Sequence, residues 1–319
     1  MSDTDLIDVT VAEIVQETPT VKSFRLVRAD GEPIGSYTPG AHIDVVGPTA
    51  VTRQYSLCGT PDADDAYIVA VKREDLSRGG SSALHELAVG DTLRISRPRN
   101  VLGIDRAAAH HVLVAAGIGI TPMLSMARYM DVHGISFELH YFARSAEEAA
   151  FLPLMQERCP TKLHAHLGIP RAEHDEVLGG LLTDLPAGSH VYTCGPDGFM
   201  DTVVAVAGRS LPEEAIHLER FHATEQPDAS ENTAFEVELE GEVYQVPADR
   251  SIVDVLQENG CDVDTSCQEG ICGTCIMSVL SGTPEHRDNV LTASEKAANE
   301  TMAVCVSRTR DARLVLDYY

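Results

Sequence analysis

The chain has 319 residues, 44% of them hydrophobic, and a formal net charge of −25, so it can form two or three domains with ordinary cores. The negative charge makes nucleic acid and anionic membrane surfaces poor partners. The longest apolar runs are too short and too glycine-rich to cross a bilayer, and the acidic start MSDTDLIDVT lacks the basic and apolar regions of a secretory signal. We therefore expect a cytoplasmic protein. A monomer is a separate expectation.

Residues 1–104 are predicted to form an all-β domain. The segments VTVAEIVQETPTVKSFRLVR and AYIVAVKR alternate in hydrophobicity as half-buried strands do, and turns with proline and glycine lie between them. A further strand is expected in SYTPGAHIDVV. The segment GGSSALHEL carries a short helical pattern.

Residues 105–222 show a different pattern, in which strands alternate with helices. HHVLVAAGIGITPMLSMARYMDVHG predicts an apolar strand, a glycine turn and a helix that ends near Gly134. FELHYFAR, KLHAHLG and HVYTCGP predict three further strands, and AEEAAFLPLMQERC and DGFMDTVVAVAGR predict helices. This alternation predicts a parallel α/β sheet. Several histidines lie at strand positions and receive no role: His110, His111, His164 and His166.

A polar linker is expected at residues 223–233, followed by a small domain at residues 234–319. In that domain, AFEVELEGEVYQV predicts a hairpin that turns at Glu240–Gly241, and SIVDVLQENG predicts a short helix closed by glycine. Residues 223–319 hold 19 Asp and Glu against 6 Lys and Arg. This charge has two interpretations: a solubilising surface, or a surface that docks on a basic protein.

Four of the eight cysteines follow the spacing Cys267-x4-Cys272-x2-Cys275-x29-Cys305. In a chain without a secretory signal, such cysteines indicate metal binding or catalysis rather than disulfides. Soft thiolates select zinc, cuprous ion or iron–sulfur clusters. Structural zinc sites usually pair their ligands as two C-x2-C motifs, whereas this spacing is that of plant-type [2Fe–2S] ferredoxins, so a cluster is favoured over zinc. Residues 235–317 resemble such a ferredoxin domain.

A candidate nucleotide site lies in AAGIGITP, where a glycine turn joins an apolar strand to a helix and can present backbone N–H groups to phosphate. By itself the turn is a weak signal, because the third glycine of the dinucleotide fingerprint is replaced by Pro122. A second turn, in YTCGPDGFM, ends a later strand. Ligands of parallel sheets bind outside the carboxyl ends of the strands, so the two turns are expected to face one another.

Together with RQYSL upstream, these turns resemble the ferredoxin-NADP reductase superfamily. The resemblance implies that the first turn takes the NAD(P)H phosphates and that the C-G-P cysteine lies beside the nicotinamide. The residues that match are Gly117, Gly119, Thr121, Cys194, Gly195 and Pro196. Cys194 would be a catalytic residue in that setting. Taken alone, it would be a buried small hydrophobic residue.

The same resemblance makes RQYSL the flavin-binding strand. Arg53 would bind the flavin phosphate, Tyr55 would offer a flat face to the ring, and Ser56 would hydrogen-bond near its reactive nitrogen as a second catalytic residue. In isolation this segment would be an ordinary strand. Other residues that match the flavin-binding pattern are Gln54, Ala70, Val71, Lys72, Gly79, Gly80 and Ser81. Phe221 matches an aromatic residue that covers the ring, with an ordinary core phenylalanine as the alternative.

The order of these motifs is similar to that of the phthalate dioxygenase reductase and vanillate demethylase reductase group. The resemblance implies an FMN-binding β-barrel at residues 1–104, an NAD(P)-binding α/β domain at 105–222 and a β-grasp (α+β) [2Fe–2S] domain at 234–319. It also implies hydride transfer from NADH to FMN, followed by single-electron transfer through the cluster to a Rieske-type terminal oxygenase docked on the acidic domain. The alternatives are a reductase for a haem-thiolate monooxygenase and a stand-alone flavin or ferric reductase.

The preferred donor is expected to be NADH. NADPH preference usually requires basic residues near the ribose 2′-phosphate. After ELHYFA the chain offers only Arg144, which is followed by Ser145 and by the acidic pair Glu147 and Glu148.

Overall fold

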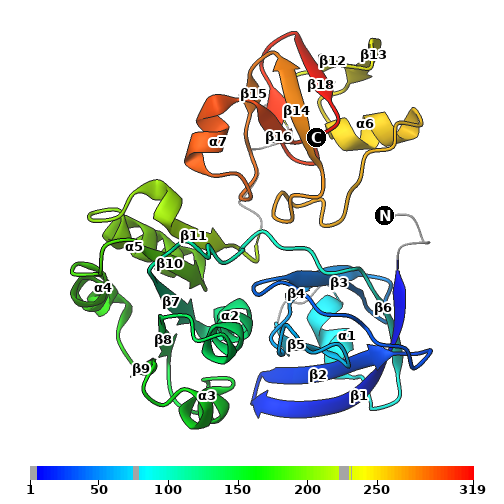
Figure 1. Cartoon of the computed structure of the whole chain (residues 1–319). Helices are drawn as coiled ribbons and strands as arrows, with labels where there is room; N and C mark the ends of the chain where they lie inside the picture. Colours follow the sequence, from blue (N-terminus) through cyan, green and yellow to red (C-terminus); the bar gives the residue numbers. More distant parts are fainter. Residues whose placement is uncertain (1–5, 75–78, 223–229, 231) are drawn as a thin grey trace. The chain divides into compact units, whose positions relative to one another are not determined.

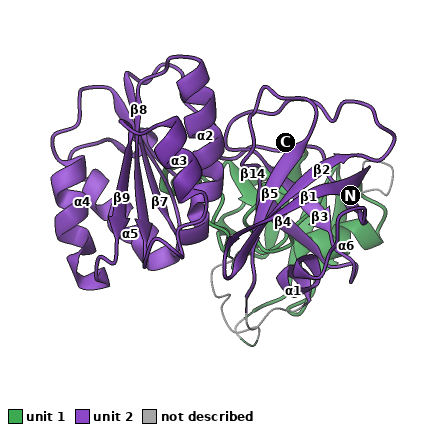
Figure 2. Cartoon of the chain, turned by 90° about the horizontal axis from the view of Figure 1, so that it is seen from below, with its two compact units in different colours: residues 1, 220–319 green, residues 2–219 purple. Residues whose placement is uncertain are grey.

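The computed structural model describes residues 6–74, 79–222, 230 and 232–319 (Figure 1). The chain divides into two compact units, residues 2–219 and residues 220–319, which are coloured separately in Figure 2. The predicted linker, residues 223–233, falls mostly outside the described residues. The predicted domain limits stay predictions; the boundary between the units lies between Glu219 and Arg220.

The first part of the larger unit is an antiparallel sheet of six strands in the order β4-β3-β6-β1-β2-β5. An isolated bridge between Leu57 and Val69 connects the end of β4 to β5, so the two edges of the sheet meet and the sheet closes as a barrel. Its interior is filled by apolar side chains that alternate along the strands, including Val9, Val11 and Ile43. The elements described in this part are β1 (Ile7–Thr18), β2 (Val21–Arg28), β3 (His42–Val46), β4 (Thr52–Ser56), β5 (Tyr67–Lys72), α1 (Gly80–His85) and β6 (Thr92–Ile95).

The second part of this unit is a parallel sheet of five strands in the order β11-β10-β7-β8-β9. The central strand β7 is buried on both faces, which explains its continuous apolar sequence. Helices α4 and α5 pack on the face that carries Val112 and Val114, and α2 packs on the opposite face (Figure 2). The elements are β7 (His110–Ala116), α2 (Ile120–Val132), β8 (Phe137–Ala143), α3 (Leu152–Arg158), β9 (Leu163–Leu167), α4 (His174–Leu182), β10 (Ser189–Cys194), α5 (Asp197–Ala207) and β11 (Ile216–Glu219).

The barrel and the parallel sheet pack against each other within this unit. The backbone N–H of Gly40 donates to Ser125 Oγ of α2 at 2.9 Å, and a Cβ atom on Gly40 would lie 2.7 Å from Met126 Cε. His133 Nε2 lies 2.8 Å from Asp62 Oδ2. Glycine at position 40, with φ of +88°, therefore permits the close approach of the loop after the second strand to α2.

The smaller unit contains a five-stranded sheet in the order β13-β12-β18-β14-β16 and a two-stranded sheet, β15-β17. The predicted hairpin and the short helix are both present: the turn has φ of 53° at Glu240 and 85° at Gly241, and Ser251 and Asp254 form a capping box. The three main sheets of the chain confirm the predicted fold class. The elements are β12 (Phe235–Leu239), β13 (Glu242–Val246), α6 (Ile252–Glu258), β14 (Ile276–Ser281), β15 (Pro284–Glu285), α7 (Ala293–Ala298), β16 (Thr301–Ala303), β17 (Arg308–Thr309) and β18 (Arg313–Asp317).

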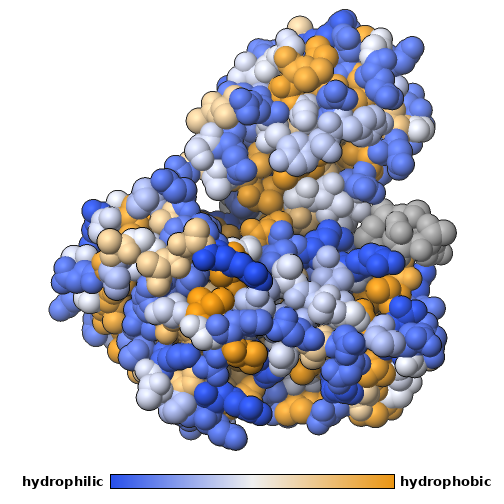
Figure 3. Space-filling model, in the orientation of Figure 1, coloured by the Kyte–Doolittle hydropathy of each residue, from blue (hydrophilic) through white to orange (hydrophobic). Residues whose placement is uncertain are grey.

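Among the described residues, no helix is both long and apolar enough to span a bilayer. Hydrophilic and hydrophobic residues are interspersed on the face shown in Figure 3.

Candidate functional site

The four predicted cluster ligands lie on two segments of the smaller unit. Cys267, Cys272 and Cys275 belong to the loop between α6 and β14, and Cys305 lies in the turn after β16. Cys272, Cys275 and Cys305 are buried, whereas Cys267 is partly exposed. The thiols interact as two pairs. Within each pair a shared hydrogen bond lowers the pKa of one thiol, Cys272 or Cys275, and raises that of its partner, Cys267 or Cys305. The thiolate is the form that binds metal.

The backbone of this loop fits a bulky inorganic core. Gly270 and Gly273 both have positive φ angles, 72° and 73°. A Cβ atom on Gly270 would lie 2.7 Å from Val306 Cγ2, so only glycine lets the loop pass this point. The N–H of Glu269 donates to Cys267 Sγ at 3.3 Å, as backbone groups do around cluster sulfurs. Four thiols arranged as two pairs suit a core with two metal ions, so the donor set fits a [2Fe–2S] cluster.

The two turns of the predicted nucleotide site lie side by side at the carboxyl ends of β7 and β10. Gly117 and Gly119 form a short 3-10 turn before α2, and Cys194, Gly195 and Pro196 follow β10. A Cβ atom on Gly119 would overlap the carbonyl group of Cys194, and one on Gly195 would lie 2.9 Å from Ala116 Cβ. These contacts require glycine on both turns and leave a backbone-lined surface that fits a dinucleotide phosphate.

The remaining two nucleotide-site residues have buried side chains. Thr121 Oγ1 donates to the carbonyl of Ile118 at 3.0 Å and so stabilises the turn itself. Cys194 is fully buried, and both its burial and the nearby charge of Glu219 raise the pKa of its thiol well above the usual value. The thiol is therefore neutral at physiological pH.

The predicted flavin residues gather at one end of the barrel. Arg53, Gln54 and Tyr55 are half-buried on β4, and Ser56 ends that strand in a buried position. Gly79 and Gly80 begin α1 beside them: a Cβ atom on Gly80 would lie 3.1 Å from Arg53 Cγ. The Arg53 side chain therefore passes close to the start of α1, and its Nη1 donates to the carbonyl of Thr52 at 2.8 Å; this flavin cradle, a guanidinium beside a helix start, has the chemistry to hold a flavin phosphate.

The other matched positions flank this cradle. Ala70 and Val71 are buried in β5, while Lys72 is exposed and pairs with Glu74 at 2.9 Å. Ser81 Oγ accepts from the N–H of Glu74 at 3.2 Å. Phe221 is partly buried and belongs to the smaller unit, so its predicted role over the flavin ring stays a prediction.

Two buried ionisable residues next to Ser56 were not predicted. Glu219, at the end of β11, is 7% exposed, and its carboxylate lies 3.5 Å from Ser56 Oγ and 3.4 Å from His42 Nδ1. Parallel pairing places Glu219 opposite Cys194. Four polar groups from the barrel and the parallel sheet therefore meet where the flavin strand and the nucleotide turn end. The sequence signal for Glu219 was its position in HLERF, two residues before Phe221.

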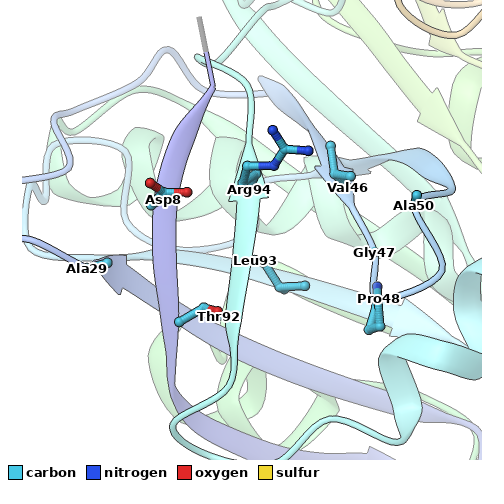
Figure 4. Close-up of a pocket in the computed structure, with 9 residues that line it drawn as sticks. All are labelled: Asp8, Ala29, Val46, Gly47, Pro48, Ala50, Thr92, Leu93 and Arg94. Carbon is cyan, nitrogen blue, oxygen red and sulfur yellow. The ribbon is translucent and has the colours of Figure 1, made fainter. Parts of the chain in front are cut away.

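A separate open pocket lies on the barrel between β1, β3 and β6 (Figure 4). Arg94 of β6 and Asp8 of β1 stand at its rim. It shares no residue with the predicted flavin, nucleotide or cluster sites, so we assign it no part in the chemistry. Its lining consists of Asp8, Ala29, Val46, Gly47, Pro48, Ala50, Thr92, Leu93 and Arg94.

Two protein families match the chain. The 2Fe-2S iron-sulfur cluster binding domain matches residues 235–310, and the N-terminal domain of dimethylamine monooxygenase subunit DmmA-like proteins matches residues 93–213. The first match covers all four cysteines of the loop and the turn.

Similar proteins extend over nearly the whole chain. The vanillate O-demethylase oxidoreductase of Acinetobacter baylyi is 40% identical over 97% of this chain and 98% of its own. A solved structure of phthalate dioxygenase reductase is 36% identical to this chain, with a TM-score of 0.72. The match covers 99% of this chain and 98% of that one. That protein is described as a modular structure for electron transfer from pyridine nucleotides to [2Fe-2S]. An intact type IV self-sufficient cytochrome P450 monooxygenase is 36% identical with a TM-score of 0.86, covering 98% of this chain but 41% of its own.

Proposed function

Because the chain belongs to the reductase family that includes vanillate O-demethylase oxidoreductase and phthalate dioxygenase reductase, we propose that it is the NADH-dependent reductase component of a two-component oxygenase. The electrons leave through the ferredoxin domain to a separate Rieske-type terminal oxygenase. The observation that carries this proposal is the end-to-end match with a vanillate O-demethylase oxidoreductase. The match covers 98% of the length of that relative.

The chain is an oxidoreductase with the cofactor set of this family: FMN, NADH and a [2Fe–2S] cluster. When bound, FMN accepts the electron pair of a hydride and releases the electrons singly, as the cluster requires. The protein binds FMN and NADH and orients them. Gly119 and Gly195 let the two turns close around phosphate, and Arg53 neutralises the flavin phosphate. Neutral Cys194 adds no second negative charge beside Glu219.

The buried polar group at the flavin strand supports a role in handling protons. A flavin reduced by hydride has to lose a proton once its electrons have left singly, and bulk water has little access to Ser56 or Glu219, which are 4% and 7% exposed. Ser56 Oγ lies 3.5 Å from the Glu219 carboxylate, so the hydroxyl that would hydrogen-bond the flavin is itself linked to a buried acid. His42 extends this set by one further imidazole at 3.4 Å from the carboxylate.

The charge of the ferredoxin domain supports docking on a basic partner. Asp262 and Asp264 are exposed just before the cluster loop, and Cys267 is the partly exposed ligand. Opposite charges on two proteins speed their association and fix its orientation, and salt weakens this effect. Replacing both aspartates by asparagine is expected to lower the association rate with the oxygenase about 3- to 10-fold at low salt and to leave NADH oxidation with ferricyanide unchanged.

An anaerobic NADH titration of the purified protein tests the proposal. We expect uptake of three electrons per chain, two on FMN and one on the cluster, followed by oxidation of the cluster when the Rieske component of a vanillate O-demethylase type system is added. The Cys272→Ser protein should still oxidise NADH with ferricyanide but should pass nothing to the oxygenase. Oxygenase turnover that survives this substitution would refute the proposed route.

One observation favours a second candidate acceptor. The relatives of known structure include self-sufficient cytochrome P450 monooxygenases, in which a region similar to this chain is part of a longer protein. A separate haem-thiolate monooxygenase is therefore the alternative partner. Offering both acceptors to the NADH-reduced protein in a stopped-flow experiment distinguishes them, since only the true partner should reoxidise the cluster with saturation at micromolar concentration.

The proposed donor is NADH rather than NADPH. Arg144 follows β8 and is exposed, and its guanidinium lies 3.7 Å from the Glu148 carboxylate, so an acidic side chain accompanies this one basic residue and disfavours a 2′-phosphate. Steady-state cytochrome c reduction with each donor tests this, and equal rates with NADPH would overturn it.

A further inference from the structure

A group of histidines that the proposed electron route does not use lies on the α4–α5 face of the parallel sheet. In the β8–β9 register His140 pairs with His164, and their rings stack with centroids 4.8 Å apart. Glu138 precedes His140 by two residues and therefore points to the same face. One atom from each of Glu138, His140 and His164 can be chosen so that all three lie within 4.8 Å of one another.

The separation of two of these atoms matches a metal site better than a hydrogen bond. His140 Nε2 lies 3.4 Å from Glu138 Oε1, longer than an ordinary hydrogen bond, and no other described residue offers this buried nitrogen a hydrogen bond. Metal–ligand bonds of about 2.0–2.2 Å in a tetrahedral zinc site separate neighbouring ligand atoms by about 3.3–3.5 Å. Two of the three ligand atoms already have this spacing. His164 is exposed, so its ring can rotate to complete the set.

A second histidine orients the buried one. His140 Nδ1 lies 3.1 Å from His166 Nε2. When His140 donates its Nδ1 proton to His166, the lone pair of Nε2 is directed at Glu138 and His164, which is the tautomer that a metal requires.

We propose that Glu138, His140 and His164 form a binding site for one divalent transition-metal ion of the zinc class. Two imidazoles and one carboxylate are the ligands that such ions take, and hard cations such as Mg²⁺ prefer oxygen alone. The remaining position is open to water or to His110, whose Nε2 lies 3.9 Å from the same Glu138 oxygen. Because β9 is an edge strand, the ion cross-links the edge of the sheet to β8.

The test is a Zn²⁺ titration of the untagged holoprotein in competition with a chromogenic chelator. The visible spectrum is recorded throughout, so that the cluster cysteines are known to remain occupied. We expect one tight site per chain and a higher midpoint of thermal unfolding with Zn²⁺, because a ligand that binds only the folded state stabilises it. His164→Gln, at an exposed position where folding is safe, should weaken binding at least 10-fold and abolish the thermal shift. Glu138→Gln should do the same.

Two further variants separate a built site from surface binding. His133→Gln removes an exposed histidine that pairs with Asp62 elsewhere in the unit, and it should bind Zn²⁺ as the unchanged protein does. His166→Leu removes the acceptor of His140 Nδ1 and should weaken binding about 10- to 100-fold, as removal of an outer-shell partner does. No stoichiometric Zn²⁺ binding, or equal affinity in the His164→Gln and unchanged proteins, would overturn the proposal.

Discussion

Replacement of Gly119 by alanine should damage NADH binding selectively. The added Cβ would overlap the Cys194 carbonyl group and would lie 2.6 Å from Gly195 N, and all of these are backbone atoms. They cannot move aside independently, because β10 pairs with β7 along its whole length, from Ser189 to Cys194. Overpacking of this kind costs about 1–3 kcal/mol. This clash pushes the two turns apart. The surface that they form together is the one predicted to hold the nucleotide phosphates.

Since 1.4 kcal/mol corresponds to a factor of ten, we expect the KM for NADH in ferricyanide reduction to rise about 10- to 100-fold. Gly195→Ala, whose nearest contacts are Ala116 Cβ at 2.9 Å and Ala116 O at 3.2 Å, should have a smaller effect in the same direction. Gly198→Ala is the matched control: it lies in α5 directly after this turn, a Cβ there meets nothing within 4 Å, and helical alanine is favoured over glycine by about 0.5–1 kcal/mol. It should leave KM within about twofold.

The assay has an internal check, because the flavin cradle and the cluster loop lie on other elements. The visible absorbance of flavin and cluster should be unchanged in all three variants. If Gly119→Ala and Gly198→Ala proteins have the same KM for NADH, the two turns are not the nucleotide site, and the reasoning fails.

Three further outcomes are expected. Gly270→Ala should lose its cluster absorbance about 10-fold faster or more on dilution into chelator. Gly260→Ala is the control, because Gly260 also has a positive φ but an added Cβ meets nothing within 4 Å, and it should lose the cluster at the normal rate. Equal rates in the two variants would refute the steric argument. Arg53→Ala should weaken FMN binding about 10- to 100-fold in fluorescence titration, the loss of a charged hydrogen bond of about 1.5–3 kcal/mol, and unchanged affinity would contradict the assigned cradle. Burial lowers the pKa of both His166 and His217 to about 4, below the unfolded value near 6.5, so their contribution to stability is complete above pH 6.5 and is lost as pH falls from 6.5 to 4. The midpoint of thermal unfolding should drop in that window, and an equal drop in a His166→Gln protein would show that this residue does not contribute.

The features predicted best from the sequence are those encoded over a few residues. The hairpin turn at Glu240–Gly241 and the helix after Ser251 depend on local conformational preferences, and the cysteine spacing sets the ligand loop directly. The start of one predicted helix was wrong. A helix was expected from Ala146, but α3 begins only at Leu152, because Phe151 adopts a left-handed conformation with φ of 61° and Pro153 occupies the first turn.

The buried polar group was missed for a different reason. Glu219 and His42 are far apart in the sequence and belong to the parallel sheet and to the barrel, so their approach to 3.4 Å depends on how these two parts pack. An isolated glutamate at the end of a short strand predicts a solvated side chain. Its burial was foreseeable only from the resemblance of the flanking segment, which drew attention to Phe221 instead.

The proposed metal site depends on the register between β8 and β9. His140 and His164 belong to different strands, and the sequence assigned His164 only to a strand position, without a face. In the structure His140 pairs with His164 and Phe142 with His166, so both histidines of β9 share a face with Glu138. A slip of one residue would turn His164 and His166 to the α2 face and separate them from Glu138. Because the pairing of β8 with β9 joins residues about 24 positions apart in the sequence, a site of this kind can be recognised only once the sheet is known.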